Sequence, residues 1–322
     1  MLLELTMCVA RVKKGFGSVV GVMFLYGAVF GQEMSPKIAI VADGKGGYTF
    51  DTGVLRGTLC PNGKLQGLTS VTHIPSGARL DRSMGILSYY RVFTTGTRYG
   101  TGAWDWPATA KLLSDTTVQV TAPAAADRPI EMTAVYRWKD PQTLDVETAV
   151  TARQDLSRFE SFVASYFDAA FPSPCVYVNE NPETGGKPGF LLAKKSLGEW
   201  QMFPRDTQVV PILRDGRWQL EPNPVNWTIM PRLNAPIGVR RAADGLVAIV
   251  MAPPEDCFAV ATPCERESHY SLYLSLFGRD IKAGETVKAH TRFVITSVAS
   301  DEQVIKSYRQ YIEELPRQTD KR

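Results

Sequence analysis

Hydrophobic and polar residues alternate along most of the chain after residue 38, in segments of five to eleven residues rich in Val, Thr, Tyr, Phe and Trp. Clusters of Gly, Pro, Asn and Asp, such as residues 43–47 and 179–189, separate these segments. This pattern is typical of β-strands joined by turns. The clearest predicted strands cover residues 116–121, 130–139, 143–153, 159–168, 227–232, 246–252, 270–277 and 286–296.

A single helix is predicted near the end of the chain, at about residues 300–315. Ser300 and Gln303 have the spacing of a capping box, and apolar residues from Val304 to Leu315 recur at helical spacing. The fold class predicted is therefore all-β, a large two-sheet antiparallel β-supersandwich with one C-terminal helix. No internal repeat or linker divides residues 32–322, so we expect them to form a single domain.

The first 31 residues have the order of a signal peptide. Lys13 and Lys14 precede an uncharged, apolar run over residues 15–30, and polar Gln32 follows Gly31, where we expect cleavage. A retained membrane anchor is the alternative, but the run is short for spanning a bilayer. The sequence thus predicts a periplasmic or secreted protein that has no membrane association after cleavage.

The mature chain is expected to be nearly neutral. The whole sequence has a formal net charge of +3, and cleavage after Gly31 would remove three basic residues and one acidic residue, leaving +1. No cluster of Lys and Arg interrupts the rest of the chain. Because nucleic-acid binding requires a basic face or stripe, we expect no nucleic-acid partner.

Four cysteines remain after the predicted cleavage. Cys257 and Cys264 are close enough in sequence to suggest a disulfide in an exported protein, although two buried free thiols are the alternative. The pairing of Cys60 and Cys175 stays open. No cysteine or histidine spacing typical of a zinc site occurs, and no nucleotide, serine-hydrolase or redox-cofactor motif is present. We therefore predict no cofactor and no metal ligand set, while a bound calcium ion is left open.

The densest group of chemically versatile side chains lies in residues 89–106. Aromatic faces stack on the C–H faces of sugar rings, and Arg and Asp hydrogen-bond to hydroxyl or carboxylate groups. This segment therefore favours a saccharide-binding role, although a loop folded over the core with buried tryptophans is the alternative. Its candidate residues are Arg91, Arg98, Tyr99, Trp104, Asp105 and Trp106.

Strand alternation sorts the remaining candidates. In residues 269–277, His269 and Tyr273 share a polar and aromatic face, opposite an apolar face of leucines. Tyr166 and Asp168 share a face of another predicted strand. His73 precedes a turn and is either an acid or base or a turn-stabilising residue, whereas the pattern around His290 predicts a solvated surface residue.

The early segment from Gly67 to Gly77, the many strands, the closing strand 286–296 and the Ser-capped final helix together resemble the galactose-mutarotase-like supersandwich superfamily. That superfamily includes aldose epimerases and sandwich domains of polysaccharide lyases and glycoside hydrolases. The resemblance implies a saccharide bound on a concave sheet face. It also implies acid–base catalysis by His and Glu, for which His73 or His269, with Glu265 or Glu267, are the stand-ins.

Two hypotheses follow. The first is an exported carbohydrate epimerase or polysaccharide lyase in which a His or Tyr moves a proton and Arg91 or Arg98 neutralises negative charge. The second is a non-catalytic saccharide-binding protein that uses the same aromatic side chains.

Overall fold

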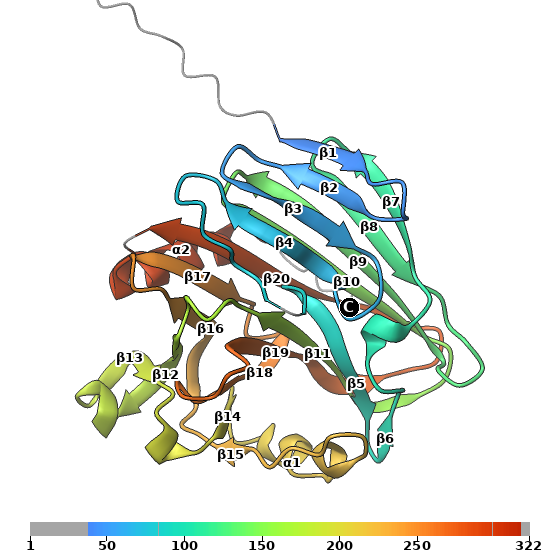
Figure 1. Cartoon of the computed structure of the whole chain (residues 1–322). Coiled ribbons are helices and arrows are strands. Elements are labelled where there is room, and N and C mark those ends of the chain that lie inside the picture. Colours follow the sequence, from blue (N-terminus) through green and yellow to red (C-terminus); the bar gives the residue numbers. More distant parts are fainter. Residues whose placement is uncertain (1–37, 83, 298, 317–322) are drawn as a thin grey trace, which may run out of the picture. The chain divides into compact units, whose positions relative to one another are not determined.

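The computed structural model describes residues 38–316 apart from 83 and 298, and its strands form three sheets (Figure 1). The predicted signal peptide lies outside the described residues. The four-stranded sheet contains, in order, β1 (Ala39–Ala42), β2 (Tyr48–Asp51), β3 (Leu55–Cys60) and β4 (Gly67–His73). The nine-stranded sheet contains, from edge to edge, β13 (Lys187–Leu192), β12 (Ser173–Asn181), β16 (Leu233–Arg241), β17 (Leu246–Met251), β20 (Thr286–Ser297), β10 (Thr143–Ala152), β9 (Ile130–Asp140), β8 (Thr117–Ala122) and β7 (Thr109–Ser114). The seven-stranded sheet contains β15 (Thr228–Ile229), β14 (Trp200–Pro204), β18 (Cys257–Pro263), β19 (Ser271–Ile281), β11 (Leu156–Tyr166), β5 (Ser88–Thr94) and β6 (Thr97–Arg98).

The all-β class and the C-terminal helix are confirmed, and a third, smaller sheet is added to the two extended sheets that were expected. Seven of the eight strands predicted most clearly match observed strands. The exception is the segment 227–232, where only Thr228 and Ile229 form a strand. Pro231 has no N–H to donate to a sheet, which limits pairing there.

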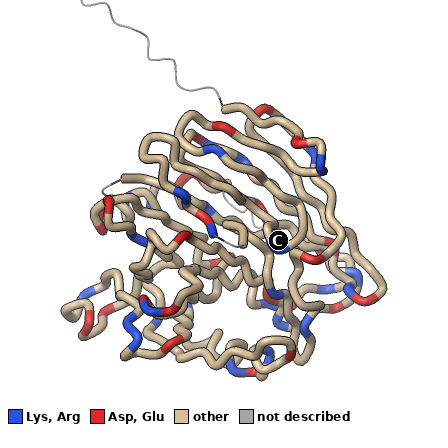
Figure 2. The backbone as a smooth tube through the Cα atoms, in the orientation of Figure 1, with Lys and Arg blue, Asp and Glu red and all other residues tan. Residues whose placement is uncertain are grey.

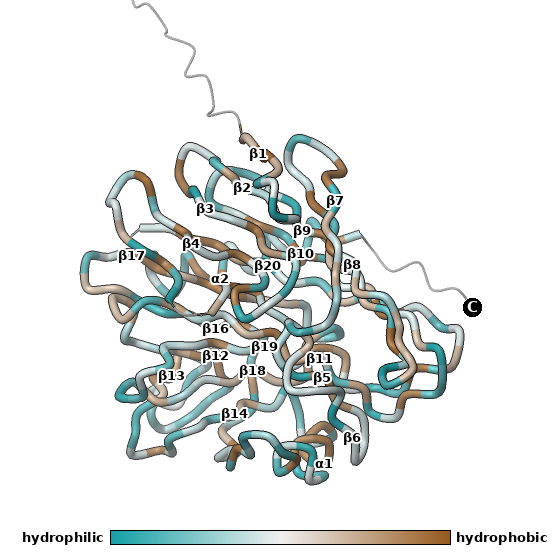
Figure 3. Tube along the Cα trace, turned by 45° about the vertical axis from the view of Figure 1, so that its right-hand side comes forward, coloured by the Kyte–Doolittle hydropathy of each residue, from teal (hydrophilic) through white to brown (hydrophobic). Residues whose placement is uncertain are grey.

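One face of the nine-stranded sheet packs against both other sheets to form the main core. On β10, for example, Leu144, Val146 and Val150 lie in this core, whereas Asp145 and Glu147 lie on the opposite face and pair with basic residues of β20. Alternation of this kind is what a strand with one buried face requires. Hydrophobic residues accordingly recur along the strands, while the loops are mostly hydrophilic (Figure 3).

The helix α2 (Asp301–Glu314) covers the outer face of the nine-stranded sheet. Its predicted capping box is present, since the Ser300 side chain accepts from the Gln303 backbone N–H and the Gln303 side chain accepts from the Ser300 N–H. Tyr308 and Tyr311 bury the apolar stripe of the helix against β16 and β17. The prediction from the 3.6-residue periodicity is therefore confirmed.

The prediction that His290 is a solvated surface residue is wrong. His290 is half-buried, its Nδ1 lies 2.8 Å from Oδ2 of Asp256, and its Nε2 lies 3.4 Å from Oε2 of Glu147. Asp256 lies in the loop between β17 and β18, which folds over this face of β20. Strand alternation identified the polar face but contains no information about a loop that covers it.

The predicted disulfide between Cys257 and Cys264 is also wrong, because both residues are buried free thiols. Cys257 begins the extended strand β18 and Cys264 follows the end of it. A strand rises about 3.3 Å per residue, so the two residues are roughly 20 Å apart, whereas a disulfide requires Cα atoms within about 7 Å. Proximity in sequence was misleading because the intervening chain is a strand and not a loop.

Short helices lie between the strands: η1 (Ala103–Asp105), η2 (Pro182–Thr184), η3 (Lys195–Leu197), α1 (Val210–Leu213) and η4 (Arg217–Gln219). Within the described part of the chain, no helix is long and apolar enough to cross a membrane. Basic and acidic residues are interspersed along the backbone, as Figure 2 shows.

Candidate functional site

A cavity of about 640 Å³ lies on the face of the seven-stranded sheet that is turned away from the main core. The strands β5, β11, β14 and β19 supply its floor, and an irregular stretch of chain between α1 and β15 supplies one side. We call this stretch, residues 214–227, the wall segment. The side chains that line the floor are Tyr90, Arg91, Phe162, Tyr166, Trp200 and Tyr273.

A β-bulge in β5 places two adjacent side chains in the cavity. Arg91 pairs with Phe162 of β11, but the next pair along the ladder is Tyr89 with Val163, so Tyr90 is an extra residue in β5. A bulge of this kind breaks strict alternation. As a result Tyr90 and Arg91 both line the cavity, while Tyr89 lies in the main core.

The wall segment is held against the sheet by a buried ion pair. Arg217 Nη1 lies 2.9 Å from Oε2 of Glu160 on β11, and both side chains are fully buried. Arg217 also donates to both carboxylate oxygens of Asp215 and to the backbone carbonyl of Arg158. The neighbouring Trp218 is thereby fixed in the cavity lining.

Aromatic rings make up much of the cavity surface. Phe162 and Tyr273 stack at a centroid distance of 4.7 Å, and Trp218 meets Phe162 edge-on at the same distance. Trp227 lies edge-on to Trp218 at 5.3 Å and to Trp200 at 5.7 Å. Offset and edge-to-face arrangements are the ones aromatic side chains prefer, so the floor and wall form one packed aromatic surface with an open side.

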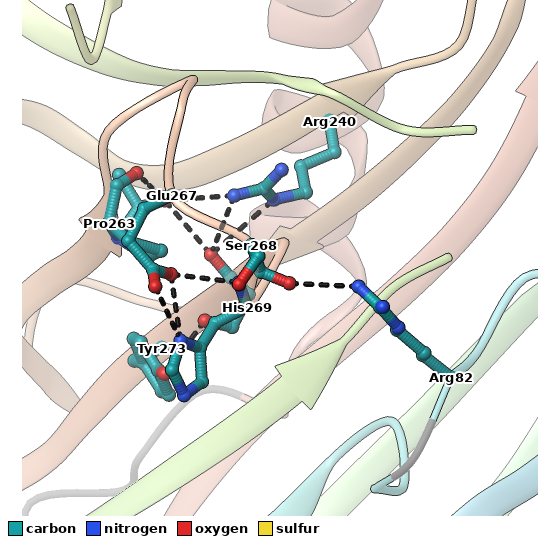
Figure 4. Close-up of polar contacts among 9 residues, drawn as sticks. Arg82, Arg240, Pro263, Glu267, Ser268, His269 and Tyr273 are labelled. Atoms are coloured by element: carbon teal, nitrogen blue, oxygen red, sulfur yellow. Dashed lines mark hydrogen bonds and ion pairs between the residues drawn. The ribbon is translucent and has the colours of Figure 1, made fainter. Parts of the chain in front are cut away.

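His269 stands at the exposed edge of this surface. Its Nδ1 lies 2.8 Å from both carboxylate oxygens of Glu267 (Figure 4), which leaves Nε2 as the free ring nitrogen. Its ring lies 5.3 Å from that of Trp200 and 6.4 Å from that of Tyr166. A carboxylate at Nδ1 fixes the orientation and tautomer of an imidazole, and leaves Nε2 able to accept a proton.

The turn that carries His269 has an unusual backbone. Tyr270 has a φ of 49°, in the left-handed region that residues other than glycine rarely adopt. Arg82 stabilises this turn from outside, since its Nη1 donates to the Ser268 carbonyl at 2.9 Å and its guanidinium lies 5.5 Å from the Tyr270 ring. Figure 4 shows this contact beside the Glu267–His269 pair.

Two phenols in the cavity are held in the protonated form. Burial raises the pKa of Tyr273 to about 12, and burial together with the neighbouring Tyr273 raises the pKa of Tyr166 well above its ordinary value, despite the opposing effect of Arg91. The Ser271 hydroxyl donates to the Tyr273 oxygen at 2.7 Å. At neutral pH both tyrosines are therefore hydrogen-bond donors or acids, and not bases.

A buried arginine lies beneath Tyr273, between the two large sheets. Arg240 donates to the carbonyls of Phe171 at 2.8 Å and Ser271 at 3.3 Å, and burial lowers its pKa to about 9. Since the Ser271 hydroxyl donates to Tyr273, these contacts connect the nine-stranded sheet to the cavity floor.

Of the residues singled out from the sequence, Arg91, Tyr166, His269 and Tyr273 are brought together in this cavity. The structure places the other candidates elsewhere. Tyr99 and Trp106 lie in the main core, Trp104 stacks behind Tyr90 at 4.4 Å, and Arg98 donates to backbone carbonyls of the wall segment. Asp105 is exposed, Asp168 accepts from the Ala170 N–H in a turn, and His73 is bonded to Ser76 at the end of β4.

Sequence reasoning missed Phe162, Trp200, Trp218 and Trp227, which all line the cavity. A signal for part of this set exists, because Trp218 and Trp227 flank a stretch of Asn and Pro that contains no strand pattern. Aromatic residues at the borders of an irregular polar loop are candidates for a binding surface. Tyr90 lies within the segment 89–106 that the sequence indicated, but its place in the cavity depends on the bulge.

No group of three or more His, Cys, Asp or Glu side chains that could hold a metal ion occurs among residues 38–316 as the structure describes them.

No protein-family model and no curated protein matches the chain. Solved structures do. A galactose mutarotase related enzyme from Lactobacillus acidophilus is 11% identical, with a TM-score of 0.44 over 79% of this chain and 99% of that one. A heparan sulfate lyase mutant from Pedobacter heparinus is 8% identical, with a TM-score of 0.45 over 81% of this chain and 37% of that one. An α-N-acetylgalactosaminidase from Bifidobacterium bifidum is 11% identical, with a TM-score of 0.44 over 86% and 38%.

These similarities are of general layout only. At such identities and TM-scores we take neither ligand nor reaction from them.

Proposed function

We propose that the protein binds a saccharide in the aromatic cavity and transfers a proton on it with His269. The observation that carries this proposal is the combination of three tryptophans, Trp200, Trp218 and Trp227, around one cavity with an oriented imidazole at its edge. A cavity of about 640 Å³ falls within the range of small-molecule sites, which is roughly 300–1,000 Å³. Indole faces suit the C–H faces of sugar rings.

Three polar side chains of the cavity have chemical roles in this proposal. The free Nε2 of His269 accepts a proton from the sugar, and Glu267 stabilises the imidazolium that forms. Tyr166 and Tyr273, both protonated at neutral pH, donate hydrogen bonds or a proton to a sugar oxygen. The reaction class is an epimerisation or an elimination, because both need one base and one acid on either side of a sugar ring.

Saccharide binding is tested by titrating mono- and oligosaccharides while following tryptophan fluorescence. Replacing Trp200 with Ala should weaken binding by about 1–3 kcal/mol, the scale known for stacking of bases on aromatic side chains. Trp138→Phe is the matched control, since Trp138 lies in the main core beside Phe50. If the wild type and Trp200→Ala bind saccharides with equal affinity, Trp200 does not stack on the sugar.

Proton transfer is tested with His269→Gln on any saccharide that binds. Optical rotation reports ring-opening epimerisation, and ultraviolet absorbance of an unsaturated product reports elimination. The proposal expects turnover to be lost and binding to be retained. Glu267→Gln should reduce turnover less, because it removes the charge but keeps a hydrogen-bond partner for Nδ1.

A non-catalytic saccharide-binding protein is the second candidate. One observation favours it: the His269 side chain is 45% exposed, so water has access to the proposed base. Binding by the wild type without turnover of any saccharide that binds would support this candidate.

We further propose that the protein acts in the periplasm or outside the cell. The support is the basic, apolar and small-residue order of residues 1–31 in the sequence. N-terminal sequencing of the exported protein should find Gln32 at or near its start, and a retained first segment would contradict cleavage.

A further inference from the structure

Arg91 is a buried cation that has no ion-pair partner among the described residues. Its side chain lines the cavity, and the residue is only 3% exposed. Nη2 donates to the Asn223 carbonyl at 2.8 Å and to the Tyr90 hydroxyl at 3.2 Å. Nε and Nη1 are buried and make no hydrogen bond to any part of the chain that the structure describes.

The other buried arginines are compensated in two ways. Arg217 pairs with Glu160 and Asp215, and Arg292 is hydrogen-bonded to two carboxylates as well. Arg240 has no carboxylate partner among the described residues, and donates to backbone carbonyls between the sheets instead. A buried charge without a partner is strongly unfavourable unless something neutralises it. Arg91 differs because it lies on a cavity, where a ligand can supply the negative charge.

The surroundings keep the charge of Arg91 available. The guanidinium lies 4.8 Å from the Tyr90 ring and 5.3 Å from the Trp218 ring, so two aromatic faces hold it in place. Glu199 is the one carboxylate among the lining residues, and it is exposed. The low dielectric of an aromatic surface strengthens the attraction between Arg91 and an anion in the cavity.

A second arginine adds to the positive field. Arg98 donates to the carbonyls of Leu220 and Pro222 in the wall segment, next to the Asn223 carbonyl that Arg91 binds. Burial lowers the pKa of Arg98, and repulsion from Arg91 lowers it further, whereas Tyr90 and Glu221 oppose this effect. Arg98 makes no ion pair within the described part of the chain.

The cavity also has unused neutral donors. The indole N–H groups of Trp218 and Trp227 are buried and have no partner among the described residues. Like Arg91, they belong to residues that line the cavity. A ligand with acceptor oxygens can pair with such donors, and an anionic group can in addition neutralise the charge of Arg91.

We propose that the cavity selects saccharides that carry an anionic group, with a carboxylate facing Arg91. This inference names the substrate class of the proposed saccharide site and rests on that proposed function. Sulfate esters share the charge and the acceptor oxygens of a carboxylate, so the test must distinguish the two.

The experiment compares matched sugars on the full mature chain. Galacturonate is titrated against galactose, and glucuronate against glucose, because the members of each pair differ only at one carbon. The acid should bind roughly tenfold or more tightly than the neutral sugar, as expected for hydrogen bonds to a charged group. Added sodium chloride should weaken binding of the acids and leave the neutral sugars nearly unaffected.

Arg91→Met should bring the affinity ratio of acid to neutral sugar close to one. If Arg91→Met does not fold, Arg91→Lys and the salt dependence of the wild type give the same information, since Lys retains the charge and should retain part of the preference. Lys111→Met, on the edge strand β7, is the control for loss of a positive charge elsewhere and should leave the ratio unchanged.

Equal affinities for acid and neutral sugars in the wild type, or a preference that survives Arg91→Met, would overturn the inference. Failure of every saccharide to bind would instead count against the proposed function itself. A sulfated galactose without a carboxylate shows which anionic group the cavity prefers. If it binds more tightly than galacturonate, the site is assigned to sulfate esters, and the proposal of a carboxylate facing Arg91 is wrong.

Discussion

Arg217→Met tests whether the buried ion pair holds the wall segment of the cavity. The substitution keeps most of the apolar stem of the side chain and removes its charge. Glu160 would then be fully buried without its cation, and Asp215 would lose two hydrogen bonds. Removing one partner of a buried pair costs about 3–5 kcal/mol, a large part of the roughly 5–15 kcal/mol that stabilises a typical domain.

Urea unfolding followed by circular dichroism, with linear extrapolation to water, measures this cost. Because Trp218 follows Arg217 directly and lines the cavity, saccharide binding should weaken in the same variant. The double variant Glu160→Met/Arg217→Met removes both buried charges of the pair and should recover part of the lost stability. A loss below about 1 kcal/mol for Arg217→Met, or a double variant as unstable as the single one, would refute this explanation.

Three further predictions concern other parts of the fold. Hydrogen bonding to Asp256 raises the pKa of His290. Charged His290 therefore stabilises the fold at pH values below its ordinary pKa of 6.5, and this contribution is lost as the pH rises through the raised pKa. The difference in unfolding free energy between the wild type and His290→Gln, measured in urea over a pH series, should shrink over the same range. Trp106→Ala should cost about 3–5 kcal/mol of stability in the same assay and leave saccharide affinity unchanged, since Trp106 is 4% exposed in the main core; weaker binding at full stability would contradict this placement. Gly85→Ala should cost at least about 1–3 kcal/mol, because its Cβ would lie 1.9 Å from the Gln66 carbonyl oxygen, and an unchanged melting temperature would show that the backbone can move there.

Strands with one buried face could be predicted from the sequence because their alternation is a direct consequence of the pleat. This is why β10 and β20 were identified almost to the residue. The same reasoning placed Tyr273 on a polar and aromatic face, and that face is the cavity floor. The capping box at Ser300 was readable for a similar reason, since its partners are three residues apart.

Features that depend on contacts between distant segments could not be predicted in this way. The bulge at Tyr90 depends on how β5 pairs with β11, and the sequence around Tyr90 does not encode that register. Trp104 and Trp106 were predicted to lie in a ligand site because they belong to a dense group of aromatic and charged residues flanked by glycines. In the structure Trp104 stacks on Tyr90, and Trp106 lies in the main core. Composition indicates which side chains are unusual, whereas only packing decides which of them face a cavity.

The wall segment shows how an irregular stretch of chain can form a defined binding surface. It contributes little to any sheet, so side chains must supply the contacts that a backbone ladder would otherwise provide. Arg217 reaches from it to Glu160 on β11, and Arg91 and Arg98 reach from β5 and β6 to its carbonyls, including that of Asn223. Arg91 also lines the cavity. In the proposed complex, an anionic sugar and the wall segment would therefore share the guanidinium of Arg91. Ligand binding should protect the backbone amides of the wall segment from hydrogen exchange, and Arg91→Met should abolish this protection.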